Sequence, residues 1–323
     1  MYISESEVRA HLTYDELIPA IRQALIDYSA GKVDQPPRMI LRSNHTQGPD
    51  NGWFAVMPVV YGGVMSVKTV TFFPGNAVLD PKLGLQTHMA MIELLSRETG
   101  QPLAVMDGRL ITEMRTAAVS AVALDRLARP NVRSLGILGA GVQARSHLQA
   151  LPTLRPTLTD IRIWSRNSDS AEKLAHEFRN GAPGLDSETT VRATTIEEAA
   201  SADVVLTVTA SPTPVLQGRW LKPDALILAV GAVGAQLREL DDEAALRSWI
   251  VAESRQAVER EAGDIILSGA KVQAELGALL ANPEQPVPRG GRILFKSVGM
   301  AVEDLVAARL VWQSQNRKHP PSA

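Results

Sequence analysis

The sequence predicts an α/β protein that combines a doubly wound parallel sheet with a separate α+β domain. In the second half of the chain, short apolar β-type runs alternate with helical segments, as in a parallel sheet with crossover helices. In the first half, β-type runs are separated by Gly, Pro and Asn turns, which is typical of a mainly antiparallel sheet. A length of 323 residues fits about two domains.

The first half of the chain has the elements expected of the α+β domain. Ser4 and Glu7 have the spacing of a capping box at the start of a short helix. Apolar residues at helical spacing predict a second helix over 14–30, which Gly31 ends. We expect strands over 53–57, 64–73, 89–95 and 102–106, followed by a helix rich in Ala and Val over 111–127.

The second half has the alternating elements of the doubly wound domain. We expect strands over 134–138, 161–165, 189–193, 203–209, 225–230, 250–253 and 293–296. The run over 203–209 is apolar without alternation, as in a strand that is buried on both faces. We expect helices over 143–151, 170–178, 195–200 and 241–248, and a final amphipathic helix over 299–313.

The composition excludes several classes of protein. A formal net charge of -2 and an aromatic content of 4% give no electrostatic or stacking reason to expect nucleic acid. The absence of cysteine excludes disulfides, thiolate metal sites and a cysteine nucleophile. The acidic start is unlike a signal peptide, and no apolar run reaches the roughly 18 residues of a membrane span. We therefore expect a cytoplasmic protein with neither a membrane nor a nucleic-acid partner.

A glycine-rich turn follows the first strand of the second half. Gly139, Gly141 and Ala144 form a Gly-x-Gly-x-x-Ala turn between that strand and a helix. Such a turn allows a pyrophosphate to approach bare backbone at a helix N-terminus, so this half is expected to be a Rossmann-type dinucleotide-binding domain. The expected contacts with the cofactor at this turn are Gly139, Ala140, Gly141, Val142 and Gln143.

The next strand end distinguishes between the two nicotinamide cofactors. An NAD site usually has an acidic residue there, whereas this chain has Ser165, Arg166 and Asn167. Because the Arg166 guanidinium and its polar neighbours can bind a 2′-phosphate, we expect NADPH, with NADH as the other possibility. Thr209, Ala210 and Gly231 end further strands and are expected to line the nicotinamide ribose.

Three basic residues stand out in the first half: Arg38, Lys68 and Arg115. Lys68 lies in an apolar strand, and Arg115 lies where a helix becomes almost wholly small and apolar. A buried cation is costly unless it is paired with an anion. A substrate carboxylate is one such partner, and an internal ion pair with Glu93, Asp107 or Glu113 is the alternative.

Several motifs together resemble the ornithine cyclodeaminase/mu-crystallin family, and within it most closely the mu-crystallin-like ketimine reductases. The motifs lie at 103–108, 111–121, 137–143, 238–242, 263–264 and 295–304. The resemblance implies that residues 1–118, completed by 300–323, form a substrate-binding and dimerisation domain, and that 119–299 form the NADP-binding domain. It also implies a homodimer built through the N-terminal sheets, with the active site between the two domains.

The resemblance also assigns roles to residues of this chain. It implies that Arg38, Lys68 and Arg115 bind the carboxylate of the substrate. It places Ser297, Val298 and Gly299 near the nicotinamide. His88 matches a histidine of the mu-crystallin branch that is able to donate to the substrate or help to place it, and a structural role is its alternative.

Two departures from the family pattern bear on the reaction. The catalytic aspartate of cyclodeaminases corresponds here to Val233, which is expected to line the substrate site, and a family glutamate corresponds to Ala55. Without these acids the chain lacks groups to hold a second amine, which disfavours cyclodeaminase activity. The remaining histidines, at positions 11, 45, 147, 176 and 319, show no metal-ligand spacing.

The expected activity is NADPH-dependent reduction of a cyclic ketimine carboxylate, Δ1-pyrroline-2-carboxylate or Δ1-piperideine-2-carboxylate, to the cyclic L-amino acid. Lys68, Arg115 and His88 are the expected catalytic residues. The alternatives are reductive amination or imine reduction of an acyclic 2-oxo acid, as in alanine dehydrogenase or iminosuccinate reductase, cyclodeaminase activity, and NADPH-dependent ligand binding without catalysis.

Overall fold

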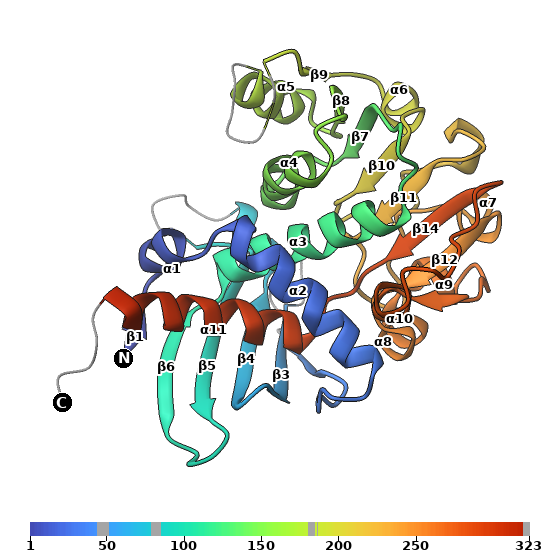
Figure 1. Ribbon diagram of the computed structural model, residues 1–323. Helices are drawn as coiled ribbons and strands as arrows, with labels where there is room; N and C mark the ends of the chain where they lie inside the picture. The colour runs from blue at the N-terminus through green and yellow to red at the C-terminus, as the bar shows by residue number, and fades with distance from the viewer. Residues whose placement is uncertain (44–51, 79–84, 180–184, 186, 319–323) are drawn as a thin grey trace. The chain divides into compact units, whose positions relative to one another are not determined.

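A computed structural model describes residues 1–43, 52–78, 85–179, 185 and 187–318 (Figure 1). The chain divides into two compact units. Unit 1 comprises residues 1–115 and 300–323, and unit 2 comprises residues 116–299. The first division lies within helix α3 (Arg109–Leu127). In the described ranges, no helix has the length and apolar character needed to cross a bilayer.

Unit 1 is built on a six-stranded sheet in the order β1-β6-β5-β4-β3-β2. The strands are β1 (Tyr2–Ile3), β2 (Met39–Arg42), β3 (Trp53–Tyr61), β4 (Val64–Phe72), β5 (His88–Ser96) and β6 (Pro102–Asp107). Neighbouring strands from β2 to β6 pair antiparallel, and β1 joins β6 in parallel. The turn-rich pattern of the first half therefore predicted the character of this sheet correctly.

Helices cover one face of this sheet. The helical elements are α1 (Glu5–His11), α2 (Tyr14–Ser29), the 3-10 turn η1 (Pro74–Val78) and α11 (Ala301–Lys318). The predicted capping box is confirmed: Ser4 N donates to Glu7 Oε2 at 2.7 Å, and the Ser4 side chain accepts from Glu7 N. Figure 1 shows α11 running across β3, β4 and β5. Helix α11 contacts these three strands and also packs against α2. The chain's last helix thus completes the core of the first unit.

Unit 2 is built on an eight-stranded sheet in which every strand pair is parallel. The strands are β7 (Ser134–Leu138), β8 (Asp160–Trp164), β9 (Thr190–Ala193), β10 (Val204–Thr207), β11 (Leu226–Ala229), β12 (Ser248–Ala252), β13 (Ala274–Glu275) and β14 (Arg292–Lys296). Their order is β13-β12-β14-β11-β10-β7-β8-β9, so the chain's last strand lies between β11 and β12.

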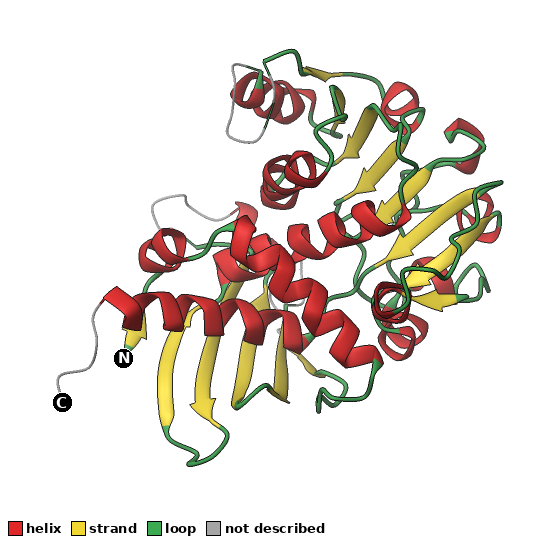
Figure 2. Cartoon of the chain, viewed as in Figure 1, coloured by secondary structure: helices red, strands yellow, loops and turns green. Residues whose placement is uncertain are grey.

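Helices flank the sheet of unit 2, as Figure 2 shows. They are α4 (Val142–Leu154), α5 (Ser168–Phe178), α6 (Ile196–Ala200), the 3-10 turn η3 (Gly218–Trp220), α7 (Asp242–Leu246), α8 (Arg255–Glu261), α9 (Gly263–Ile266) and α10 (Leu276–Ala281). The strand order runs outward from β7 in both directions, which confirms the doubly wound topology. The switch point lies between β7 and β10, where such folds bind ligands at the carboxyl ends of the strands.

Candidate functional site

Lys68 lies inside unit 1, with its side chain 3% exposed. Alternation along β4 directs it to the same buried face as Ser66 and Val70. Its Nζ donates a hydrogen bond of 2.9 Å to Oδ1 of Asp304 on α11. The lysine expected to be buried is therefore buried, and it has a carboxylate partner within the chain.

Arg115 on α3 is buried beside the same acid. Its Nε donates to Asp304 Oδ1 at 3.2 Å, and its NH1 donates to Glu303 Oε2 at 2.8 Å. One oxygen of Asp304 therefore accepts from both Lys68 and Arg115. We refer to Arg38, Lys68, Arg115, Glu303 and Asp304 as the cation cluster.

Sequence reasoning named Glu93, Asp107 and Glu113 as alternative partners and missed both acids found here. Glu303 and Asp304 stand in the first turn of α11, where free backbone amides and the helix dipole favour negative charge. Glu303 Oε2 also accepts from Met300 N at 3.2 Å. The available signal was two adjacent acids inside the otherwise apolar run 300–308, which are as costly to bury as Lys68.

The cation cluster brings positive and negative side chains close together. Two carboxylates, Glu303 and Asp304, face Lys68, Arg115 and Arg38, whose positive charge acts on Lys68. The pKa of Lys68 is lowered to about 8, mainly by burial and also by the positive charges of Arg115 and Arg38, while Asp304 opposes the shift. The carboxylate of a ligand would be attracted to these cations, because a nearby negative charge favours the charged form of Lys68.

His88 begins β5 and lies close enough to the cluster to be affected by its charges. Burial lowers the pKa of His88 to about 4, and the positive charges of Lys68 and Arg115 act in the same direction. At neutral pH the imidazole is therefore uncharged, so it can exchange hydrogen bonds but does not add a further positive charge.

The glycine turn of unit 2 has the backbone that a dinucleotide requires. Gly139 has φ +124°, and a Cβ there would lie 2.7 Å from the carbonyl oxygen of Val208. Gly141 is the N-cap of α4 without a side-chain cap, and no heavy atom lies within 4 Å of where its Cβ would be. The first amides of α4 are thus reachable by a phosphate, and these residues fit the pyrophosphate of a nicotinamide cofactor.

The end of β8 presents the polar residues expected to distinguish the cofactors. Ser165 is partly buried, and Arg166 and Asn167 are exposed. Asn167 caps α5, because its Oδ1 accepts from Asp169 N at 3.0 Å. Its amide nitrogen and the Arg166 guanidinium are the donors at this strand end.

Two buried carboxylates hold the remaining loops at the carboxyl edge of the unit 2 sheet. Glu253 accepts from Ser297 Oγ at 2.8 Å and from Gly299 N at 2.7 Å. Glu239 holds the backbone of Thr209 and Gly231. Sequence reasoning selected the loops and missed both acids, since an acid that anchors a distant loop leaves no local pattern.

The positions expected to lack acids lie in different surroundings. Ala55 is fully buried in β3, and Val233 is partly buried against the hydrophobic core of unit 2. Among the described residues, no cluster of His, Asp and Glu is arranged to hold a metal ion. His147 is fully buried and contacts the Gln143 carbonyl oxygen and Ser120 Oγ, which is a structural role; His45 and His319 lie outside the described residues.

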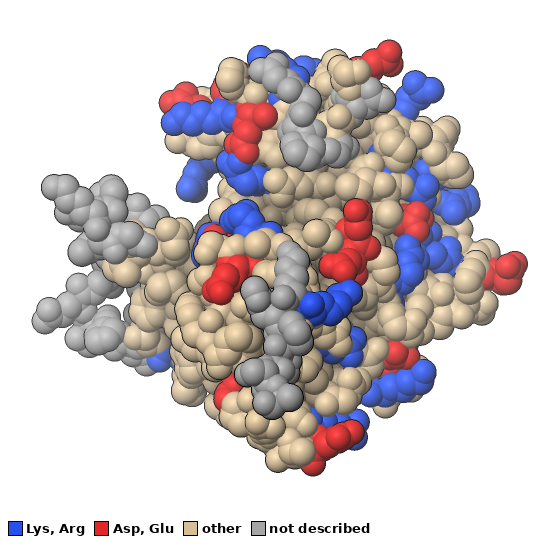
Figure 3. All heavy atoms as spheres, turned by 60° about the vertical axis from the view of Figure 1, so that its left-hand side comes forward, with Lys and Arg blue, Asp and Glu red and all other residues tan. Residues whose placement is uncertain are grey.

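The surface of the protein carries charge of both signs. On the face in Figure 3, acidic and basic side chains are interspersed among uncharged ones. The cation cluster of unit 1 differs from this surface charge, because all of its members except the partly buried Arg38 are buried.

Comparison with known proteins gives full-length matches. The sequence matches the ornithine cyclodeaminase/mu-crystallin family over residues 1–319. The ketimine reductase mu-crystallin of Mus musculus is 39% identical over 320 residues, covering 97% of this chain and 96% of the mouse protein.

Two solved structures are similar along the whole chain. One is Δ1-pyrroline-2-carboxylate reductase of Thermococcus litoralis in complex with NADH and L-proline, with a TM-score of 0.89 and 32% identity over 99% of this chain and 98% of that one. The other is an archaeal alanine dehydrogenase dimer with bound NAD, with a TM-score of 0.89 and 28% identity over 100% of this chain and 98% of that one.

Proposed function

The chain belongs to the ornithine cyclodeaminase/mu-crystallin family, and from that premise we propose that it reduces a cyclic ketimine carboxylate with a nicotinamide cofactor. The substrate is Δ1-pyrroline-2-carboxylate or Δ1-piperideine-2-carboxylate, and the product is the cyclic L-amino acid. The observation that carries the proposal is that two buried cations, Lys68 and Arg115, meet at one carboxylate oxygen of Asp304, with the pKa of Lys68 lowered to about 8.

The cation cluster is proposed to bind the carboxylate of the substrate. Arg38, Lys68 and Arg115 supply the donors, and Glu303 and Asp304 hold Lys68 and Arg115 in fixed orientations. Fixed donors place a bound ring without a further loss of side-chain freedom. The gain in rate comes mainly from this positioning of the imine carbon.

Unit 2 is proposed to bind the cofactor, with NADPH preferred over NADH. The turn from Gly139 to Gln143 would hold the pyrophosphate, and Ser165, Arg166 and Asn167 would hold the 2′-phosphate. Thr209, Ala210, Gly231 and the loop 297–299 would surround the nicotinamide ribose. When bound, the reduced nicotinamide supplies a hydride for the imine carbon.

Lys68 is the proposed source of a proton where the imine is not already protonated. Its pKa of about 8 keeps it charged at neutral pH while making it a stronger acid than an ordinary lysine. His88 is uncharged at neutral pH and is better suited to accept or donate a hydrogen bond that orients the ring. A protonated iminium needs no further acid, which is consistent with Val233 and Ala55 in place of family carboxylates.

The experiment mixes purified protein and NADPH with each cyclic imine and follows the absorbance of the reduced cofactor. Oxidation of NADPH with either ring, without ammonia, is the expected result. Absence of oxidation with both rings from mildly acidic to neutral pH would refute the proposal. Ammonia-dependent turnover of a 2-oxo acid would instead indicate reductive amination, ammonia release from ornithine would indicate a cyclodeaminase, and tight NADPH binding without turnover would indicate a binding protein.

The outer face of the unit 1 sheet is proposed to bind a second copy of the chain. Met89 and Met91 on β5 are 39% and 50% exposed, and Met39 and Leu41 on the edge strand β2 are 60% and 56% exposed. Exposed apolar side chains in such number are typical of a protein interface. Light scattering should give the mass of a dimer, and Met91→Glu should shift it toward the monomer; a monomeric wild type would refute the proposal.

A further inference from the structure

Glu239 is a fully buried carboxylate that accepts five hydrogen bonds from two loops of unit 2. Its Oε1 accepts from Thr209 N at 2.6 Å and from Thr209 Oγ1 at 2.8 Å. Its Oε2 accepts from Thr207 Oγ1 at 2.9 Å, Gly231 N at 2.8 Å and Ala232 N at 3.0 Å. One side chain therefore joins the ends of β10 and β11.

The main chain of Glu239 is itself fixed by a second buried acid. Asp264 Oδ1 accepts from Glu239 N at 2.7 Å and from Leu240 N at 2.9 Å. Asp264 Oδ2 forms an ion pair of 2.9 Å with Lys296, the last residue of β14. Lys296 Nζ also donates to the carbonyl oxygen of Ala232 at 2.9 Å. The network thus spans the carboxyl ends of β10, β11 and β14.

The position of this network points to a ligand rather than to the core alone. Parallel sheets of this topology bind ligands at the carboxyl ends of their strands. At Gly231 a Cβ would lie 2.6 Å from Glu239 Oε1 and 2.3 Å from the Thr209 carbonyl oxygen, so the loops meet too closely for a side chain. Burying three charged groups is costly, and apolar residues would pack this edge at less cost.

We infer that Glu239 is a positioning residue that holds the loops after β10 and β11 against the nicotinamide half of the cofactor. The inference rests on the proposed function in that it requires a bound nicotinamide dinucleotide, but it does not depend on which imine is reduced. The turn at 139–143 and Arg166, which would bind the other half of the cofactor, donate no hydrogen bond to Glu239 among the described contacts.

The variant Glu239→Gln tests the inference by changing one oxygen into a donor. If the remaining oxygen faces Thr209, the new NH₂ group faces the N–H groups of Gly231 and Ala232, which cannot accept. If the amide flips, the same conflict arises at Thr209 N. In either case one of the two loops loses its anchor, while the size of the side chain is unchanged.

The measurement is calorimetric binding of NADPH and of 2′-phospho-ADP-ribose, which lacks the nicotinamide, with NADH and ADP-ribose as a second pair. Glu239→Gln should weaken the binding of NADPH and of NADH by about tenfold or more. The affinities for the nicotinamide-free ligands should stay within about twofold of wild type. Equal weakening of both members of a pair, or no weakening of either, would overturn the inference. Failure of imine reduction leaves this readout unaffected.

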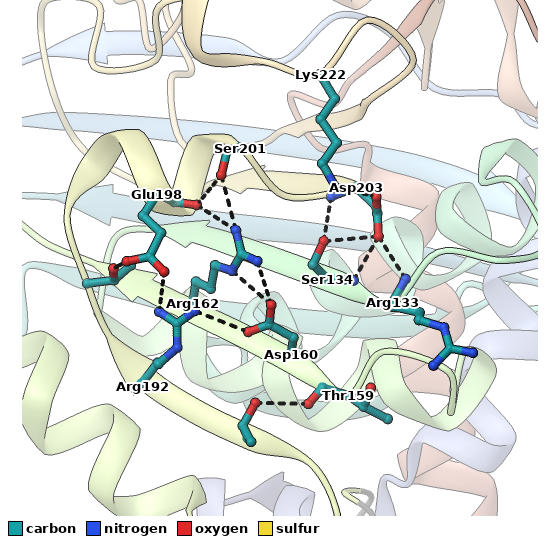
Figure 4. A network of polar contacts seen from close by, with 12 residues as sticks. Arg133, Ser134, Thr159, Asp160, Arg162, Arg192, Glu198, Ser201, Asp203 and Lys222 are labelled. Carbon is teal, nitrogen blue, oxygen red and sulfur yellow. Dashed lines mark hydrogen bonds and ion pairs between the residues drawn. The ribbon is translucent and has the colours of Figure 1, made fainter.

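Asp203→Asn is the matched control. Asp203 is a largely buried carboxylate at the opposite end of β10, where it accepts from Arg133 N, from Ser134 N and Oγ, and from Lys222 (Figure 4). Asp203→Asn should lower the melting temperature, and any change in affinity should be the same for the two ligands of a pair. If Glu239→Gln does not fold, Thr209→Val removes one donor and keeps the backbone N–H. Thr209→Val should weaken binding of NADPH and NADH selectively, but by less than Glu239→Gln does. Binding of all four ligands with wild-type affinity would refute the inference.

Discussion

Asp304 Oδ1 accepts a hydrogen bond of 2.9 Å from Lys68 Nζ, and the two side chains are 1% and 3% exposed. The same oxygen accepts from Arg115. Removing a buried carboxylate leaves its cations without compensation, which is strongly destabilising. The pair therefore stabilises unit 1 and at the same time sets the charge of a proposed catalytic group.

Asp304→Asn should lower the free energy of unfolding by about 3–5 kcal/mol, because Arg115 would keep its charge with one anion fewer, and Lys68 would either stay charged without its partner or give up its proton. The loss should appear in urea unfolding at neutral pH. Asp242→Asn is the control, since Asp242 forms an exposed ion pair with Arg238 and such pairs contribute about 0–1 kcal/mol. Equal losses in the two variants would contradict the role of Asp304.

The value of kcat/KM should be constant below pH 8 and decrease above it, because Lys68, with a pKa of about 8, loses its positive charge in that range. The protonated form is needed both to bind a carboxylate and to supply a proton. Since the charge of Asp304 raises the pKa of Lys68, Asp304→Asn should move this decrease to lower pH. Profiles measured from about pH 6 to about pH 10 test both statements.

Lys68→Arg and Lys68→Met separate charge from proton transfer. Lys68→Arg keeps the positive charge at all these pH values, so the alkaline decrease should disappear. Lys68→Met should lower kcat/KM by about 10²–10⁴-fold, the usual contribution of an acid or base group. NADPH binding should stay unchanged in both variants, because its proposed site is in unit 2. A Lys68→Met variant within threefold of wild-type activity would rule out a catalytic role for Lys68.

Much of the fold was predictable because its signals are local. The strand before Gly139 and the helix after it are encoded within about 20 residues by apolar periodicity and turn chemistry. The apolar run around Lys68 predicted a buried cation correctly. The edge strand Met39–Arg42 was missed, since four residues give little periodicity, and no local signal places β14 between β11 and β12.

The partners of the candidate site residues were not predictable from local signals. Asp304 is 236 residues from Lys68 in the chain, and Glu239 is 30 residues from Thr209. Such pairs depend on how the elements pack. The sequence alone shows that burying a cation is costly, but it does not show which acid offsets that cost. Three acids of the first half, Glu93, Asp107 and Glu113, were therefore named instead of Glu303 and Asp304.

Arg166→Ala should weaken the binding of NADPH by about 10–100-fold, since a hydrogen bond to a charged group contributes about 1.5–3 kcal/mol. NADH should bind as in wild type, because it has no 2′-phosphate. The measurement is titration of both cofactors by nicotinamide fluorescence. Arg192→Ala is the control: Arg192 on β9 pairs with Glu198 and Asp160 (Figure 4) and should affect neither cofactor. Equal weakening of NADH and NADPH would exclude 2′-phosphate recognition by Arg166.

Asp203→Asn should reduce stability at neutral pH by about 1–3 kcal/mol, and this difference should shrink in acid. Although burial opposes it, hydrogen bonds from Lys222, Arg133 N and Ser134 hold the pKa of Asp203 well below its usual range. A carboxyl group with a lowered folded pKa stabilises fully above its unfolded pKa of about 3.9 and loses that contribution as the pH falls further.

The difference between wild type and Asp203→Asn should therefore be constant from neutral pH down to about pH 5 and decrease steadily from there to pH 2. Urea unfolding of both proteins across this range is the measurement. Asp169→Asn, at the exposed start of α5, should change stability by no more than about 0.5 kcal/mol at any pH. A difference for Asp203→Asn that stays constant down to pH 2 would show that packing of the side chain, rather than its negative charge, stabilises the amino-terminal edge of the unit 2 sheet.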